Sequence, residues 1–440
     1  MASVGTGAAL YIRAGRLLEG DGAAPVSGGA VLIEDGRIVA AGRASEVGEP
    51  ASGVTVVEYP DGTVMPGLID AHVHLTMRRG ETSVEYVQLI PESVALLRGV
   101  RASAEILAAG VTTVRDCGAR GRVLQDLRDA IRDGFVPGPR VLASGPPITT
   151  TAGHLWALGY ESDTAEAGRR AVRRLVKEDA DFIKICATGG GMTPGSNVGR
   201  AQYPVEDLRA IADDAHRLGR QIAAHAHGTE GLARAVSAGI DTIEHVSWLD
   251  TTGRGQAFDE AVAREMAARG TFANIASSPP RSLVETARPV AAQDAAGAGG
   301  MVTSGERPTI ARWEHARRAM ELGVPVCFST DAVYGYWDDG HDLSYLAQAL
   351  VEVGTFPVLE VLRMITAVPA RAIGWGDRLG TVSEGKLADL LVVRGNPAER
   401  VRALHDVLAV YKEGVLVSEN GGPARAVGTA WGRPIGTAVH

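Results

Sequence analysis

Two pairs of histidines, each with one residue between its members, are the side chains of this 440-residue chain best suited to chemistry. The first pair is His72 and His74, and the second is His225 and His227. Alternate residues of a β-strand point to the same side, so each pair presents two imidazoles to one metal ion. A single pair of this kind is common in proteins without a metal, so further ligands are needed before a metal site is predicted.

Three more polar residues interrupt or end apolar, strand-like segments. His245 and Asp331 each end such a segment, and Lys184, one of only four lysines, lies inside another. Two interpretations of Lys184 are open, because a buried ammonium is costly without a partner. Either its tip reaches solvent at the end of the strand, or its neutral amine has taken up CO2 as a carbamate. With four imidazoles and a carboxylate, a carbamate would complete a nitrogen and oxygen set suited to two zinc ions.

Eight apolar, strand-like segments alternate with helical patterns in the middle of the chain. This alternation predicts an α/β fold, a (β/α)8 barrel of the TIM type, whose active site lies at the C-terminal ends of the strands. An open, doubly wound sheet is the alternative, but no glycine-rich phosphate loop follows the first strand. The eight segments are residues 68–75, 111–116, 140–144, 181–187, 221–225, 241–245, 271–276 and 325–331.

The two ends of the chain differ from the middle. Residues 1–66 contain short strand-like segments with tight turns, and residues 379–420 have the same character. Neither piece is long enough for a core of its own, so we expect them to pair into one small β-sandwich. Residues 67–378 would form the metal-dependent barrel beside it. Residues 421–440, rich in glycine, alanine and proline, are expected to form a loose tail.

The composition excludes several classes of protein. The formal charge is 44 − 52 = −8 and the arginines are scattered, so no nucleic-acid partner is predicted. No apolar run reaches about 18 residues, so no membrane span is expected. Three widely spaced cysteines and the lack of a recognisable secretory signal favour the cytoplasm. We expect a small-molecule or peptide substrate, and the composition leaves a homo-oligomer open.

Seven motifs resemble those of the amidohydrolase superfamily. The similarity spans residues 8–418 and is greatest with the imidazolonepropionase-related, prolidase-like branch, which includes zinc dipeptidases and N-acyl amino acid hydrolases such as ochratoxin-type amidases. The motifs are very specific for fold and metal chemistry and much less specific for the substrate. They are Met65-Pro-Gly-Leu-Ile-Asp-Ala-His-Val-His74, Gly110–Asp116, Phe182-Ile-Lys184, Ala224-His-Ala-His227, Thr242-Ile-Glu-His245, Ser329-Thr-Asp331 and Leu379–Val393.

The resemblance implies a centre with two zinc ions, bridged by a CO2-derived carbamate on Lys184. His225 is preferred to His227 as a ligand, because the branch often has another polar residue at the position of His227. His72, His74 and Asp331 would bind the more buried ion, His225 and His245 the more exposed one, and Lys184 both.

Such a centre implies a hydrolytic mechanism. Two cations lower the pKa of a water between them, so a metal-bridging hydroxide would attack the substrate. Asp331 would accept the proton and later deliver it to the leaving nitrogen. His227 would steady the oxyanion or a substrate group. His154 lies where the branch has a histidine that contacts the substrate, and the alternative is an ordinary surface-loop histidine.

The predicted function is hydrolysis of a C–N amide or amidine-like bond in a dipeptide, an N-acyl amino acid or a peptide-derived substrate. Tyr334, Tyr336 and Trp337 follow the last strand and would either bind the substrate or pack their own loop. The alternative is a pathway-specific enzyme that trims a peptide natural product, as bottromycin-type maturation enzymes do. Deamination is disfavoured, because mononuclear deaminases lack the lysine that Lys184 matches, and hydrolysis of a cyclic amide is a further, lower-ranked alternative.

Overall fold

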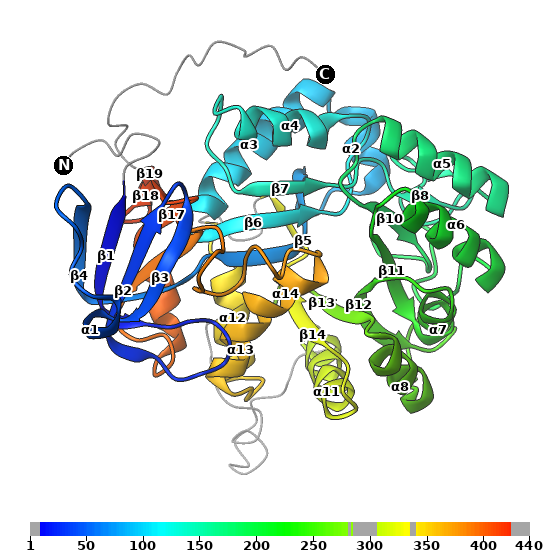
Figure 1. The fold of residues 1–440 in the computed structure, drawn as a ribbon. Helices are drawn as coiled ribbons and strands as arrows, with labels where there is room; N and C mark the ends of the chain where they lie inside the picture. Colours follow the sequence, from blue (N-terminus) through cyan, green and yellow to red (C-terminus); the bar gives the residue numbers. More distant parts are fainter. Residues whose placement is uncertain (1–8, 280–282, 285–305, 335–339, 424–440) are drawn as a thin grey trace.

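The fold was described from a computed structural model, which covers residues 9–279, 283–284, 306–334 and 340–423. Within these ranges, two parallel sheets with surrounding helices form the middle of the chain, and strands from its two ends form a third sheet (Figure 1). No helix in the described ranges is both long and apolar enough to span a membrane.

All eight predicted strand segments of the middle region are strands, so the predicted α/β fold with parallel strands is confirmed. The strands lie in two sheets, with the orders β15-β5-β6-β7 and β14-β13-β12-β11-β10-β8-β9. Every neighbouring pair in both sheets is parallel. The short strands β8, β9 and β15 are present in addition to the eight predicted ones. The strands of the two sheets are β5 (Leu68–Arg78), β6 (Val111–Asp116), β7 (Arg140–Ala143), β8 (Ile148–Thr149), β9 (Tyr160–Glu161), β10 (Ile183–Cys186), β11 (Ile222–Gly228), β12 (Thr242–Leu249), β13 (Phe272–Ala276), β14 (Val326–Ser329) and β15 (Ala332–Tyr334).

The two parallel sheets meet at two seams, and at each seam the chain itself crosses from one sheet to the other. After β14 it continues into β15, which pairs with β5, and the backbone N–H of Asp331 donates to the carbonyl of His72 (3.0 Å). After β7 it continues into β8, which pairs with β10. Here the N–H of Asp181 donates to the carbonyl of Ala143 (2.8 Å), and the Asp181 carboxylate accepts from the N–H of Ala143 (2.8 Å).

Helices follow most of the parallel strands and bury one face against them. In α5 the residues Gly168, Ala171, Val172 and Leu175 are buried, at the spacing of one helix face, and the Thr164 hydroxyl caps the first turn. Figure 1 shows α5 to α8 along the outer side of β10, β11 and β12. The helices are α1 (Ala44–Val47), α2 (Ser83–Leu89), α3 (Glu92–Ala108), α4 (Val123–Arg132), α5 (Ala165–Lys177), α6 (Val205–Arg217), α7 (Thr229–Ser237), α8 (Glu260–Arg269), α11 (Arg307–Glu321), α12 (Asp342–Glu352), α13 (Val358–Met364), α14 (Ala367–Ala372) and the 3-10 helix η1 (Val401–His405).

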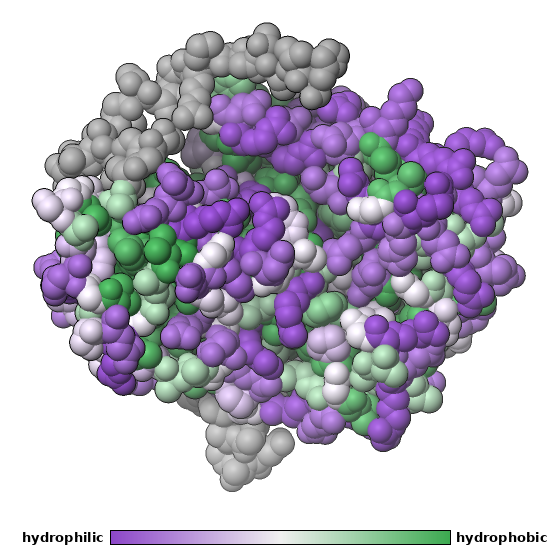
Figure 2. Space-filling view, in the orientation of Figure 1, coloured by the Kyte–Doolittle hydropathy of each residue, from purple (hydrophilic) through white to green (hydrophobic). Residues whose placement is uncertain are grey.

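The third sheet has eight strands, in the order β19-β18-β17-β16-β4-β1-β2-β3, and joins the two ends of the chain. β16 pairs antiparallel with β4, with Leu391 opposite Met65. In Figure 2, apolar side chains form a patch over this sheet, whereas hydrophilic side chains cover most of the remaining visible face. The strands are β1 (Leu10–Leu17), β2 (Val26–Glu34), β3 (Arg37–Arg43), β4 (Thr55–Pro66), β16 (Leu390–Arg394), β17 (Val407–Lys412), β18 (Val415–Glu419) and β19 (Gly422–Pro423).

The sheet extends slightly beyond the predicted boundary at residue 420. β19 pairs with β18, so residues up to Pro423 belong to it, and the rest of the expected tail lies outside the described residues. At the other end, β4 leads directly into β5 through Gly67. A Cβ at this glycine would lie 2.3 Å from the hydroxyl of Thr112, so only glycine fits there.

A buried ion pair fastens the third sheet to the parallel strands. Arg140, at the start of β7, donates to the carboxylate of Asp389 (2.6 Å), and their side chains are 12% and 3% exposed. Its guanidinium also donates to Thr113 and Glu413 and lies 5.4 Å from the ring of Trp375. Removing one partner of such a pair leaves an uncompensated buried charge.

We therefore expect Arg140→Met to lower the free energy of unfolding by about 3 kcal/mol, measured by urea denaturation. Arg132→Met is the matched control, because Arg132 is 61% exposed and pairs with Asp133 at the surface. Its expected cost is below about 1 kcal/mol. Equal losses in the two variants would contradict the assigned role of Arg140.

Candidate metal centre

The four predicted ligand histidines converge from the middle of β5, β11 and β12. The ring centroids of His72 and His245 are 4.8 Å apart, those of His225 and His245 are 4.5 Å apart, and those of His72 and His74 are 5.4 Å apart. All four side chains are buried. Histidines that lie up to 173 residues apart in the sequence, from His72 to His245, therefore form one cluster.

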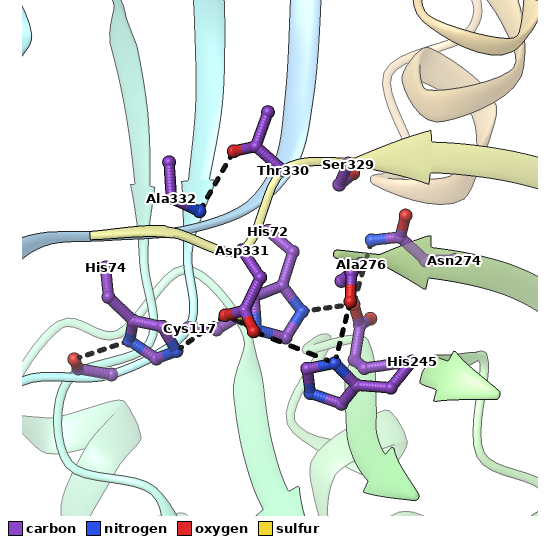
Figure 3. A network of polar contacts seen from close by, with 12 residues as sticks. His72, His74, Cys117, His245, Asn274, Ala276, Ser329, Thr330, Asp331 and Ala332 are labelled. Atoms are coloured by element: carbon purple, nitrogen blue, oxygen red, sulfur yellow. Dashed lines mark hydrogen bonds and ion pairs between the residues drawn. The ribbon is translucent and has the colours of Figure 1, made fainter. Parts of the chain in front are cut away.

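The first group of candidate ligands is His72, His74 and Asp331. The carboxylate of Asp331 lies 3.5 Å from Nε2 of His72 and 3.7 Å from Nε2 of His74 (Figure 3). The Nδ1 atoms of both rings point elsewhere, to Glu244 (2.6 Å) and to the carbonyl of Gly118 (3.2 Å). Nε2 of His72 is buried and has no hydrogen-bond partner among the described residues, as expected of a nitrogen that serves as a metal ligand.

The second group is His225, His227 and His245, whose candidate ligand atoms all lie within 4.8 Å of one another. One nitrogen of each ring is engaged by a protein oxygen. His225 Nε2 lies 2.9 Å from the carbonyl of Gly189, His245 Nδ1 lies 3.0 Å from that of Ala276, and His227 Nδ1 lies 2.8 Å from the Ser247 hydroxyl. The other nitrogen of each ring remains available, so His227 is close enough to be a ligand as well, and the preference for His225 stays a prediction.

Lys184 lies in β10, with 1% of its surface exposed. Its positive charge lowers the pKa of histidines in both groups of candidate ligands. Burial lowers the pKa of His74 to about 4, and the positive charge of Lys184 is the next cause. Burial and then Lys184 also hold the pKa of His72 well below its usual value. The imidazoles are therefore neutral near pH 7, the state in which they bind metal ions. Burial lowers the pKa of each of His154, His225, His227 and His245 in the same direction.

Asp331 is held in an uncommon backbone conformation, with φ of 53°. The preceding Thr330 donates from its hydroxyl (2.6 Å) and its N–H (3.2 Å) to the carboxylate of Asp70, which fixes the turn. Partial burial raises the pKa of Asp331 to about 7, opposed by the nearby charges of Lys184 and Arg312. A carboxyl group with a pKa near the working pH is suited to accept and return a proton.

The structure places His154 beside the cluster and not on the surface. Its ring centroid lies 4.3 Å from that of His225, and its Nδ1 lies 3.2 Å from the hydroxyl of Thr193. The alternative of a surface-loop histidine is therefore wrong, whereas contact with a substrate stays a prediction. The side chains of the predicted aromatic loop, Tyr334, Tyr336 and Trp337, lie outside the described part of the structure.

Two features of the site were missed in the sequence. The first is Glu244, which precedes His245 and to which the sequence analysis assigns no role, although an acid inside an apolar strand is itself a signal. The second is Arg312 in α11, whose charge acts on Asp331 and His227. Its Nε is buried and has no hydrogen-bond partner within the described ranges. Nothing in the sequence distinguishes this arginine from the many others.

Comparison with known proteins gave consistent relatives. Ochratoxinase from Aspergillus niger is 29% identical over 449 aligned residues, which cover 92% of this chain and 86% of that protein. Imidazolonepropionase from Symbiobacterium thermophilum is 25% identical, covering 84% of this chain and 85% of that protein. The crystal structure of a Xaa-Pro dipeptidase with bound methionine has a TM-score of 0.75 and 28% identity, covering 93% of this chain and 99% of that one.

The model of one protein family also matches most of the chain. That family is described as the amidohydrolase family, and the match runs over residues 63–417. These residues include both seams between the parallel sheets and every candidate ligand described above. The match covers well over half of the 440 residues, and the chain therefore belongs to the amidohydrolase family.

Proposed function

We propose that this protein is a metal-dependent hydrolase that cleaves a C–N amide bond in a small substrate with a free carboxylate. The observation that carries the proposal is the convergence of neutral, buried imidazoles, Lys184 and Asp331 at one point of the fold. The relatives named ochratoxinase and Xaa-Pro dipeptidase support the amide-bond class. The expectation of a cytoplasmic enzyme without a nucleic-acid partner is kept from the sequence.

The proposal includes the finer features of the fold. We infer that the two parallel sheets close into one (β/α)8 barrel over residues 67–378, supported by the chain crossings at both seams. Residues 1–66 and 379–420 would form the accessory β-sandwich. One apolar cluster supports this unit, because it contains residues of both segments, including Ile12 and Val31 from one and Val392 and Tyr411 from the other.

The residues present fit two divalent ions, which we infer to be zinc. His72, His74 and Asp331 would hold one ion, and His225 and His245 the other. Lys184, carboxylated by CO2, would lie between them. When bound, such ions supply Lewis acidity to a water ligand and to a carbonyl oxygen.

The protein's own groups would bind the substrate and move the proton. Asp331, with a pKa of about 7, would accept a proton on its carboxylate and return it to the leaving nitrogen. His227 is oriented by its hydrogen bond to Ser247, and its other ring nitrogen would steady the oxyanion or a substrate group. His154, buried against His225, would contact the substrate.

Arg312 favours a substrate with a free carboxylate. A guanidinium whose Nε is buried without a partner is costly, and a substrate carboxylate would supply the missing acceptor. Dipeptides and N-acyl amino acids carry this group at the position next to the scissile amide. The trimming of a larger peptide inside its chain would leave Arg312 without that acceptor, so we rank the natural-product function second.

The function is tested with a panel of dipeptides and N-acyl amino acids, each compared with its C-terminal amide. Hydrolysis of the free acids in preference to the amides supports the proposal. Release of ammonia without a carboxylic acid product would show deamination and would contradict it.

Arg312→Met should raise the KM for a free-acid substrate by about 10- to 100-fold, because one charged hydrogen-bond donor is removed. The KM for the corresponding amide should change little. Arg318→Met, on the exposed side of the same helix, is the control and should leave both values unchanged. An equal rise for acid and amide would mean that Arg312 does not bind the carboxylate.

Asp331→Asn should leave the protein folded with most of its metal and lower kcat by about 10²- to 10⁴-fold, because the amide cannot accept the proton. Metal analysis of the purified variant accompanies the rate measurement. Turnover near that of the wild type with intact metal content would reject the role of Asp331 in proton transfer.

Lys184→Ala should lose bound metal, because the bridging oxygens cannot form. Bicarbonate with a short carboxylic acid should restore part of the metal content and activity. Lys177→Ala, at an exposed position of α5, is the control and should keep its metal. Full metal occupancy in Lys184→Ala would exclude the carbamate.

A further inference from the structure

A buried carboxylate lies directly behind the metal cluster and has three hydrogen-bond donors. Glu244 of β12 accepts from Nδ1 of His72 (2.6 Å), from the guanidinium of Arg115 (2.5 Å) and from the side-chain amide of Asn274 (2.8 Å). Its side chain is fully buried. The donors come from β5, β6 and β13, so the carboxylate of Glu244 in β12 joins four strands of the two parallel sheets. Figure 3 shows the side chains of His72 and Asn274, which both contact Oε2 of Glu244.

Arg115 balances the charge of this carboxylate. The guanidinium is 1% exposed and lies 5.2 Å from the ring of Phe182. Its Nε donates to the carbonyl of Ala71 (2.8 Å), the residue before His72. A buried carboxylate without a counter-charge would be strongly disfavoured, and Arg115 supplies that counter-charge to Glu244.

Both oxygens of this carboxylate are engaged by N–H donors, Oε1 by Arg115 and Oε2 by Asn274. Nδ1 of His72 lies 2.6 Å from Oε2, so the ring faces Glu244 as a third donor, with its proton on Nδ1. Nε2 then keeps its lone pair and points toward Asp331, 3.5 Å away. This is the nitrogen that has no partner among the described residues.

We propose that Arg115 and Glu244 form a charge-balanced positioning pair that keeps His72 in the Nδ1–H tautomer, with Nε2 ready to bind a divalent ion. The pair touches neither substrate nor ion and acts through His72. The inference rests on the proposed metal centre but not on the identity of the substrate, so failure of the substrate panel leaves it standing.

A competing arrangement uses the same carboxylate as a ligand. Candidate ligand atoms of His72, Cys117 and Glu244 also lie within 4.8 Å of one another. In that arrangement Nδ1 of His72 would bind the ion. The hydrogen bond from Nδ1 to Glu244 argues against it, and burial raises the pKa of the Cys117 thiol to about 12, which disfavours the thiolate that metals require.

The decisive variant is Glu244→Gln, because an amide has one acceptor side and one donor side. The charged Arg115 has the stronger demand for the amide oxygen, so the NH2 group turns toward His72 and Asn274, and the Asn274 amide rotates to present its oxygen. The ring must then accept at Nδ1 and carry its proton on Nε2, the nitrogen needed for the ion. We expect 15N spectra of histidine-labelled, metal-free protein to show this exchange of tautomer, and the Kd for Co²⁺ to rise by about 10- to 100-fold.

A second substitution should reverse the effect of the first. In Arg115→Met/Glu244→Gln no charge competes for the amide oxygen, which is free to face His72 again. The Nδ1–H tautomer should return, and the affinity for Co²⁺ should recover in part although the protein loses stability. Arg140→Met/Glu244→Gln is the matched control, because Arg140 also pairs with a buried carboxylate and lies over an aromatic ring, and it should give no recovery.

His72→Gln identifies the resonance of His72 by its disappearance. The metal-free wild type supplies a test that needs no further variant, since a proton on Nε2 of His72 would overturn the proposal. Weakened Co²⁺ binding in Glu244→Gln with an unchanged tautomer would also overturn it and would make Glu244 a ligand. Failure of Arg115→Met to restore the tautomer would remove Arg115 from the pair.

Discussion

The hydrogen bond from the N–H of Asp331 to the carbonyl of His72 is the interaction on which the site depends. It lies at the seam where β14 ends and the chain continues into β15, the neighbour of β5. The bond therefore brings the carboxylate of Asp331 to the imidazoles of His72 and His74 in β5. The hydrogen bond from the Thr330 hydroxyl to the Asp70 carboxylate also fixes this turn. Without this seam the candidate ligands would remain on two separate sheets, and the distances from Asp331 to His72 and His74 would not be set.

Much of the fold and most of the site were predictable from the sequence, because the signals are local. Strand and helix periodicities located eight of the eleven strands in the two parallel sheets, all except the short β8, β9 and β15. The candidate ligands stand within short motifs in or next to these strands. The pairing of Arg115 with Glu244 was not predictable, because it joins residues 129 positions apart in the sequence. The role of Arg312 was not predictable either, because only the packing of α11 shows that its Nε is buried and has no hydrogen-bond partner among the described residues.

The site combines two kinds of buried group with opposite electrostatic needs. Its imidazoles are useful as ligands only while they stay neutral, and burial is the largest cause that lowers their pKa values. Behind them, Glu244 accepts hydrogen bonds from three side chains, and Arg115 supplies the counter-charge of this carboxylate. The strands therefore place the Arg115–Glu244 ion pair behind the neutral ligand histidines. The residues that position a ligand are thus different from the residues that would bind the ions.

The pairing of β4 with β16 has a consequence for the order in which the protein folds during synthesis. β4 leads straight into β5, the strand that carries His72 and His74, yet its partner β16 is translated only after the whole parallel region. One edge of β4 must therefore remain open on the ribosome until residues 390–394 emerge. An open strand edge beside an apolar surface favours pairing with other chains, so the nascent protein is exposed to aggregation at β4 until β16 becomes available.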